Sequence, residues 1–98
     1  MKCEEVSNFM GIIKNTENLI RMERNVWADE LDAMERRYER EVVQEKRLPD
    51  EEKERLKRRM GEVRQLVKYY NRALFGLSES WSDLEAGKMY LDKLSSNY

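Results

Sequence analysis

Clustered basic residues are the first candidates for chemistry in this chain. Residues 36–76 hold thirteen Lys and Arg against eight Asp and Glu, and eight of the thirteen lie within 53–72. Proteins contact nucleic-acid phosphates through such clusters. The candidate phosphate contacts are Lys53, Lys57, Arg58, Arg59 and Arg64. However, acidic residues interleave the segment at helical spacing, which favours internal ion pairs on a solvated face over nucleic-acid binding.

Residue types that support catalysis or metal binding are scarce. The chain has no histidine, so it lacks the usual neutral-pH general base and the commonest metal ligand. It has no glycine-rich phosphate loop, and Cys3 is its only cysteine, which excludes an internal disulfide and a zinc-binding cysteine pair. Without a neighbouring histidine, Cys3 is expected to be an unreactive thiol. We therefore expect no enzymatic activity, no cofactor and no metal site.

The sequence carries no signal for secretion or membrane insertion. Its first residues, Met1-Lys2-Cys3-Glu4-Glu5, are charged, and no apolar core follows them. No uncharged apolar run approaches the roughly 20 residues that a membrane span needs. A lone cysteine is typical of a reducing compartment. These features predict a cytoplasmic protein, or one that acts in the cytoplasm of a host.

The only proline, Pro49, divides the chain into two arms of almost equal length. Charged and apolar residues each make up 40% of the chain, a balance typical of amphipathic helices. Because proline is tolerated only in the first turn of a helix, we expect one helix over about 4–46, a turn at 47–50 and a second helix from about 50. The predicted fold is all-α: a single, elongated domain built as an antiparallel helical hairpin.

A break is predicted near Gly76. Ser78 and Ser80 follow the glycine and could cap a new helix. The second arm would then consist of one helix over about 50–75 and another over about 79–95. The pattern leaves open whether the chain forms two long arms or three helices.

Apolar residues form one stripe along each arm at spacings of three, four and seven. Such spacing places side chains on one helical face, which must be covered in the folded state. The first stripe contains Val6, Ile13, Ile20, Trp27 and Met34, and the second contains Leu56, Met60, Val63, Val67, Tyr70, Leu74 and Leu77. Facing positions in the hairpin would have numbers that add to about 97, which pairs Trp27 with Tyr70.

A further apolar row on the first arm predicts self-association. Ile12, Leu19, Val26 and Ala33 repeat in steps of seven beside the first stripe. Soluble monomers rarely expose such a line of aliphatic side chains. Either a second copy covers the row and completes a four-helix bundle, or the segment after Gly76 folds back onto it. We expect the homodimer, with Ile12, Leu19 and Val26 as its self-association residues.

Apolar residues outside the stripes are the candidates for contact with another protein. Phe75, Met89, Tyr90 and Tyr98 lie in the last quarter of the chain, and large aromatic residues dominate protein interfaces. Small helical proteins of this kind occur among phage and viral inhibitors of host machinery, chaperones and adaptors. The sequence therefore favours a non-enzymatic protein-binding module with a role of this class. Nucleic-acid association through segment 53–72 is the alternative.

Overall fold

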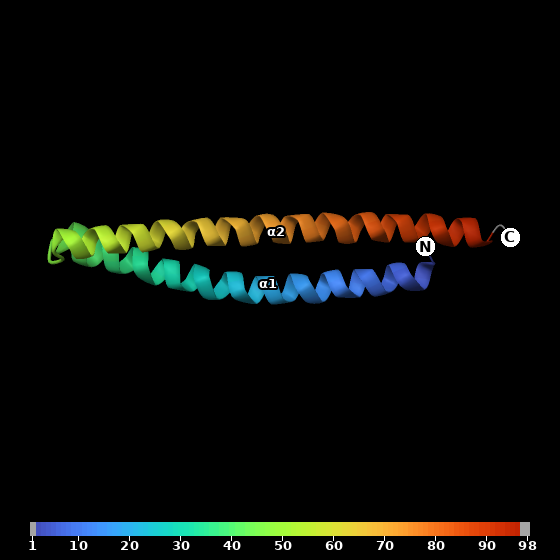
Figure 1. Cartoon of the computed structure of the whole chain (residues 1–98), viewed down its shortest axis with the longest axis horizontal. Helices are drawn as coiled ribbons and strands as arrows, with labels where there is room; N and C mark the ends of the chain where they lie inside the picture. The colour runs from blue at the N-terminus through green and yellow to red at the C-terminus, as the bar shows by residue number, and fades with distance from the viewer. Residues whose placement is uncertain (1, 97–98) are drawn as a thin grey trace. The chain divides into compact units, whose positions relative to one another are not determined.

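The computed structural model describes residues 2–96, and these are helical almost throughout (Figure 1). The elements in chain order are α1 (Cys3–Tyr38), the π-helix η1 (Glu39–Gln44) and α2 (Asp50–Ser96). No strand occurs within residues 2–96, so the all-α prediction is confirmed.

Charged residues at both ends of α1 stabilise this helix. Glu4 and Glu5 lie in the first turn, and Arg36 and Arg37 lie in the last turn. Acidic side chains stabilise the positive end of the helix dipole, and basic side chains stabilise its negative end. With no proline inside, α1 runs for 36 residues.

The first arm ends in η1 rather than in the α-helix expected up to about residue 46. The Glu45 N–H donates to the Arg40 carbonyl at 3.0 Å, five residues back, as in a π-helix. Lys46 then adopts a left-handed backbone conformation with φ of 49°. The Arg47 N–H donates to the Glu41 carbonyl at 2.8 Å, six residues back, which is one residue longer than the bond that ends an α-helix at a left-handed residue. The helix therefore stops before Pro49 is reached.

Pro49 starts the second helix as predicted. Residues 45–49 form the connection, and the Pro49 carbonyl accepts a hydrogen bond of 2.9 Å from the Lys53 N–H. Asp50, Glu51 and Glu52 occupy the first turn of α2, where carboxylates complement the helix dipole.

The predicted break near Gly76 is wrong. α2 continues from Asp50 to Ser96 without interruption, so the described second arm holds one helix and not two. Gly76 does not adopt a positive φ, and glycine inside a helix costs only about 1 kcal/mol relative to alanine. The apolar stripe passes Gly76 without a change of phase, from Leu74 to Leu77, and its packing offsets that cost.

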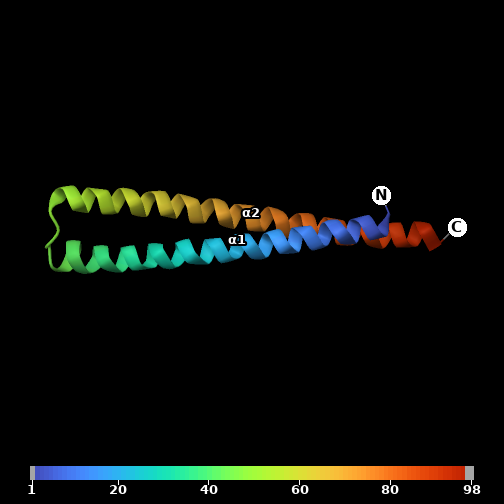
Figure 2. The same cartoon turned by 60° about the horizontal axis from the view of Figure 1, so that its bottom comes forward.

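The chain divides by contact into two compact units. Unit 1 pairs α1 up to Arg21 with α2 from Arg72 onward, and unit 2 spans Met22–Asn71. Unit 2 is a helical hairpin closed by the connection at residues 45–49. In unit 1 the beginning of α1 lies beside the last part of α2, and the two segments run antiparallel (Figures 1 and 2).

Both predicted stripes supply the core. The buried apolar residues are Val6 and Leu74 in unit 1 and Leu56, Met60 and Val63 in unit 2, and all five are stripe members. The other members of the first stripe, from Ile13 to Met34, are half-buried. No large side chain of the described residues is fully enclosed, so the core of each unit is thin.

Contacts between the arms lie close to the expected register. In unit 1, Cys3 contacts Asp92 and Lys14 lies over Trp81. In unit 2, Arg24 contacts Asn71 and Lys57 lies over Tyr38. The numbers of each of these four pairs add to 95, close to the 97 expected for facing positions. The longer reach of arginine gives a wider spread in unit 2, with 89 for Glu30–Arg59 and 99 for Glu35–Arg64. The specific pairing of Trp27 with Tyr70 stays a prediction.

Candidate interaction surfaces

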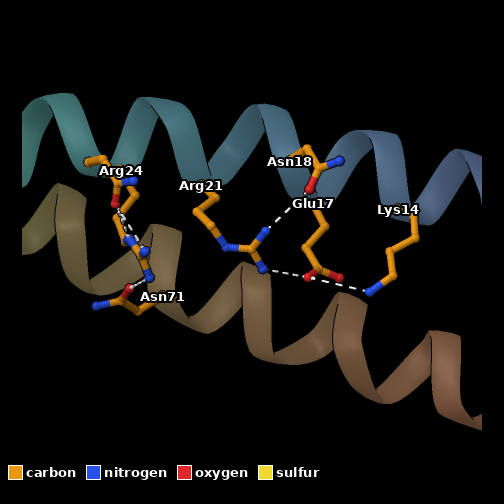
Figure 3. A network of polar contacts seen from close by, with 7 residues as sticks. Lys14, Glu17, Asn18, Arg21, Arg24 and Asn71 are labelled. Atoms are coloured by element: carbon orange, nitrogen blue, oxygen red, sulfur yellow. Dashed lines mark hydrogen bonds and ion pairs between the residues drawn. The ribbon is translucent and has the colours of Figure 1, made fainter.

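A buried carboxylate interrupts the first stripe in unit 1. Glu17 lies seven residues after Met10, in line with the apolar side chains, and is only 7% exposed. Arg21 Nη2 donates to its Oε1 at 2.5 Å, and Lys14 Nζ lies 4.0 Å from the same oxygen (Figure 3). Its Oε2 is buried and has no hydrogen-bond partner within residues 2–96.

Arg24 occupies the corresponding position of the stripe in unit 2, seven residues after Glu17. Its Nη1 donates to Asn71 Oδ1 at 3.1 Å (Figure 3). Its Nε and Nη2 donate to Asn25 Oδ1 at 3.2 and 3.0 Å. Polar residues at such positions fix the register of paired helices at a cost in stability. Sequence reasoning missed both because it counted only apolar residues; the step of seven from Met10 to Leu31 passes through them.

Cys3 contacts the opposite arm of unit 1. Its Sγ donates a hydrogen bond to Asp92 Oδ1 at 2.9 Å. This bond stabilises the protonated thiol and is the main reason that the pKa of Cys3 lies above its ordinary value; desolvation acts in the same direction. A thiol with a raised pKa is a poor nucleophile, in keeping with the unreactive role expected for Cys3.

Three of the five residues predicted to contact phosphates form ion pairs with carboxylates of this chain. Lys57 pairs with Glu54 at 3.8 Å, Arg59 with Glu30 at 3.2 Å and Arg64 with Glu35 at 3.3 Å. Lys53 and Arg58 have no ion pair within residues 2–96. The arrangement supports internal ion pairing over phosphate binding, and nucleic-acid association stays an untested prediction.

A hollow in unit 2 is lined by three arginines, but carboxylates compensate their positive charges. It has a volume of about 410 Å³ and is lined by Met34, Arg37, Glu52, Arg55, Leu56 and Arg59. Each of the three arginines pairs with a carboxylate, at Glu41, Glu51 and Glu30 respectively. Little positive charge is left uncompensated there.

Ion pairs also hold the end of η1 against the connection in unit 2. Glu41 accepts hydrogen bonds from Arg37 Nε at 2.7 Å and from Arg47 Nη2 at 3.1 Å. The bond from Arg37 is the main reason that the pKa of Glu41 lies below its ordinary value. These contacts place Glu41 in a structural role at the turn.

Exposed apolar side chains concentrate in unit 1. Phe9, Ile12, Leu19, Phe75, Met89, Tyr90 and Leu94 belong to unit 1, and Met22, Val26, Val43 and Tyr69 belong to unit 2. The predicted self-association residues are therefore available, with Leu19 65% exposed. Because α2 does not break at Gly76, no folded-back helix covers this row, and that alternative is wrong.

Three of the four predicted partner-binding residues lie on α2 in unit 1. Phe75 is 67% exposed, and Met89 and Tyr90 are exposed to a similar extent. Tyr98 lies outside the described residues. Beside Phe75 is a hollow of about 400 Å³, lined also by Ser78, Glu79, Ser82 and Asp83. Sequence reasoning found the aromatic residue but missed the carboxylates and hydroxyls around it.

Residues 2–96 offer neither a membrane-spanning segment nor a metal-binding cluster. Neither α1 nor α2 contains a stretch long and apolar enough to cross a membrane. Nor does this part of the chain gather three or more side chains of the His, Cys, Asp and Glu types in a way that could hold a metal ion. Comparisons with protein-family models, curated proteins and solved structures found no match to this chain.

Proposed function

We propose that this protein is a non-enzymatic helical module that binds other proteins and forms a homodimer. The observation that carries the proposal is its large accessible surface of 7546 Å². A folded monomer of 11.9 kDa is expected to expose about 5,900 Å². The chain therefore exposes about 1,600 Å² more surface than a compact globular monomer of its mass.

A second copy is the occupant that best accounts for this excess. If each protomer covered about 1,600 Å², the dimer would bury about 3,200 Å², within the range of obligate homodimers. The thin core, with no large side chain fully enclosed among the described residues, supports the same need for a partner.

The outer row of α1 is the proposed dimer surface. Ile12, Leu19 and Val26 share one helical face by their spacing of seven, and all three are exposed. A twofold axis would bring the same row from both protomers together, and twofold pairing is the commonest oligomeric solution. The product would be a four-helix bundle.

Light scattering at micromolar concentration tests the dimer. The wild-type chain should show twice the 11.9 kDa of one chain, and Leu19→Lys should reduce the mass to that of a monomer. Phe75→Lys is the matched control, because it places the same charge at an equally exposed apolar site on α2. A wild-type monomer, or a dimer that tolerates Leu19→Lys, would contradict the proposed interface.

In this proposal the dimer acts in the cytoplasm, or in that of a host, as an adaptor, chaperone or inhibitor of a partner protein. The face of α2 that carries Phe75, Met89 and Tyr90 would remain available for that partner. Affinity capture with the wild-type chain and with Phe75→Ser tests this role. A partner retained equally by both would show that the α2 face is not the binding surface.

A further inference from the structure

The outer face of α2 in unit 1 has a large apolar side chain at each end and a small side chain between them. Phe75, Ser82 and Met89 lie in one row by their spacing of seven, and Tyr90 lies next to Met89. All four residues are exposed. With a rise of about 1.5 Å per residue, Phe75 and Met89 are about 21 Å apart along the helix. A partner helix could lie over the small side chain between them and contact both ends.

Charge along this face is negative from Phe75 as far as Gly87. Residues 73–87 contain Glu79, Asp83 and Glu85 and no Lys or Arg. At the far end, Lys93 Nζ lies 5.2 Å from the centre of the Tyr90 ring. None of the three acids has an ion pair within residues 2–96, whereas acids such as Glu30, Glu35 and Glu41 in unit 2 are paired. The face therefore presents uncompensated negative charge beside exposed apolar groups.

The hollow beside Phe75 combines the two properties. Its lining consists of one aromatic ring, two hydroxyl groups and two carboxylates, from Phe75, Ser78, Ser82, Glu79 and Asp83. A guanidinium group suits such a lining, because it is attracted to aromatic faces and donates paired hydrogen bonds to carboxylates. All five residues are exposed and belong to α2, so the hollow of about 400 Å³ is an open depression on the helix surface, over which the end of one long side chain can lie.

We infer that the α2 face from Phe75 to Tyr90 binds an amphipathic helix of a partner protein that carries arginine beside its apolar residues. The arginine lies over the open hollow, its guanidinium meets Glu79 and Asp83, and its stem contacts the Phe75 ring. The apolar side chains of the partner cover Met89 and Tyr90. This inference rests on the proposed protein-binding function and names the partner chemistry at its α2 surface.

Two synthetic peptides test this recognition against the full-length chain by calorimetry. One is an amphipathic helix of leucine and arginine, and the other has glutamate in place of every arginine. We expect the wild-type chain to bind the arginine peptide at least about tenfold more tightly than the glutamate peptide, with an affinity that falls as salt rises. Equal affinity for both peptides would overturn the inference.

Reversing the charge of the two acids in the hollow tests whether the arginine peptide binds there. Glu79→Lys combined with Asp83→Lys should weaken the arginine peptide by about tenfold and strengthen the glutamate peptide. The matched control is Glu52→Lys combined with Glu62→Lys, which reverses two exposed acids of unit 2 and should leave both affinities unchanged. Phe75→Ser should weaken the arginine peptide by about fivefold. Helicity by circular dichroism verifies that each variant is folded.

The oligomeric state, measured on the same samples, separates this inference from the proposed dimer. A dimer that ignores the arginine peptide overturns the inference and leaves self-association standing. A monomer that still binds the peptide through Glu79 and Asp83 overturns the dimer alone. If Phe75→Ser converts a dimer to a monomer, the α2 face is covered by a second copy, and the inference is overturned.

Discussion

Arg21 donates a 2.5 Å hydrogen bond to one oxygen of Glu17, while the other oxygen of that buried carboxylate has no partner within residues 2–96. Both residues lie on α1, so the pair holds the carboxylate without linking the two arms. A buried polar atom without a partner costs free energy that an apolar side chain would not. Glu17 therefore weakens unit 1 where the stripe would otherwise be apolar.

Glu17→Leu is expected to raise the free energy of unfolding by about 1 kcal/mol, because it removes the unsatisfied oxygen and completes the stripe. Arg21→Ala should lower it by a similar amount, because it leaves the carboxylate without its closest partner. Urea unfolding at one fixed protein concentration measures both. A Glu17→Leu variant less stable than wild type would show that the carboxylate stabilises this position.

Lys46→Gly is expected to stabilise the end of the first arm. Lys46 holds a φ of 49°, which is costly for a side chain with a β-carbon and natural for glycine. The expected gain in the free energy of unfolding is about 1 kcal/mol. Gln44→Gly, inside η1, is the control and should cost about 1 kcal/mol. Equal effects of the two substitutions would contradict the left-handed assignment.

Asp92→Asn is expected to make Cys3 more reactive. The Asp92 carboxylate raises the pKa of the Cys3 thiol above its ordinary value of 9.0, so less thiolate is present at any pH below that value. Removing the charge should shift the pH profile of alkylation by iodoacetamide toward lower pH and raise the rate at pH 8. Asp83→Asn, also on α2, is the control. An unchanged pH profile would show that the Cys3–Asp92 contact does not form in solution.

The basic segment is expected not to bind nucleic acid, because three of its five candidate contacts are neutralised by carboxylates. At low salt, fluorescence anisotropy with labelled duplex DNA and single-stranded RNA should show no binding. If binding does occur, Lys53→Glu with Arg58→Glu decides its origin. Weaker binding in that variant, with a reduced dependence of the affinity on salt, would support the nucleic-acid hypothesis.

The heptad pattern alone predicted the helical faces from which the core is built. Every buried apolar residue of the described chain, from Val6 to Leu74, belongs to a stripe read from spacing. The reason is local, because helical geometry determines which side chains share a face. The exposure of Ile12, Leu19, Phe75 and Met89 followed from the same argument, since each lies outside the stripes.

The heptad pattern could not predict contacts between residues that are far apart in the sequence. Glu30 and Arg59 are 29 residues apart, and their ion pair depends on how the two arms of unit 2 lie against each other. The hollow beside Phe75 likewise needed coordinates, although its carboxylates are visible in the sequence.

By itself, the sequence determined the helical class, the start of α2 directly after Pro49 and the two stripes from which every buried apolar residue of the described chain comes. Only the tertiary structure decided that α2 runs through Gly76 and that Glu17 is buried. Gly76 and the serines after it permit a break by local preference, but Leu74, Leu77 and Trp81 continue one stripe in the same phase. Packing along that stripe outweighs the roughly 1 kcal/mol that a glycine costs inside a helix.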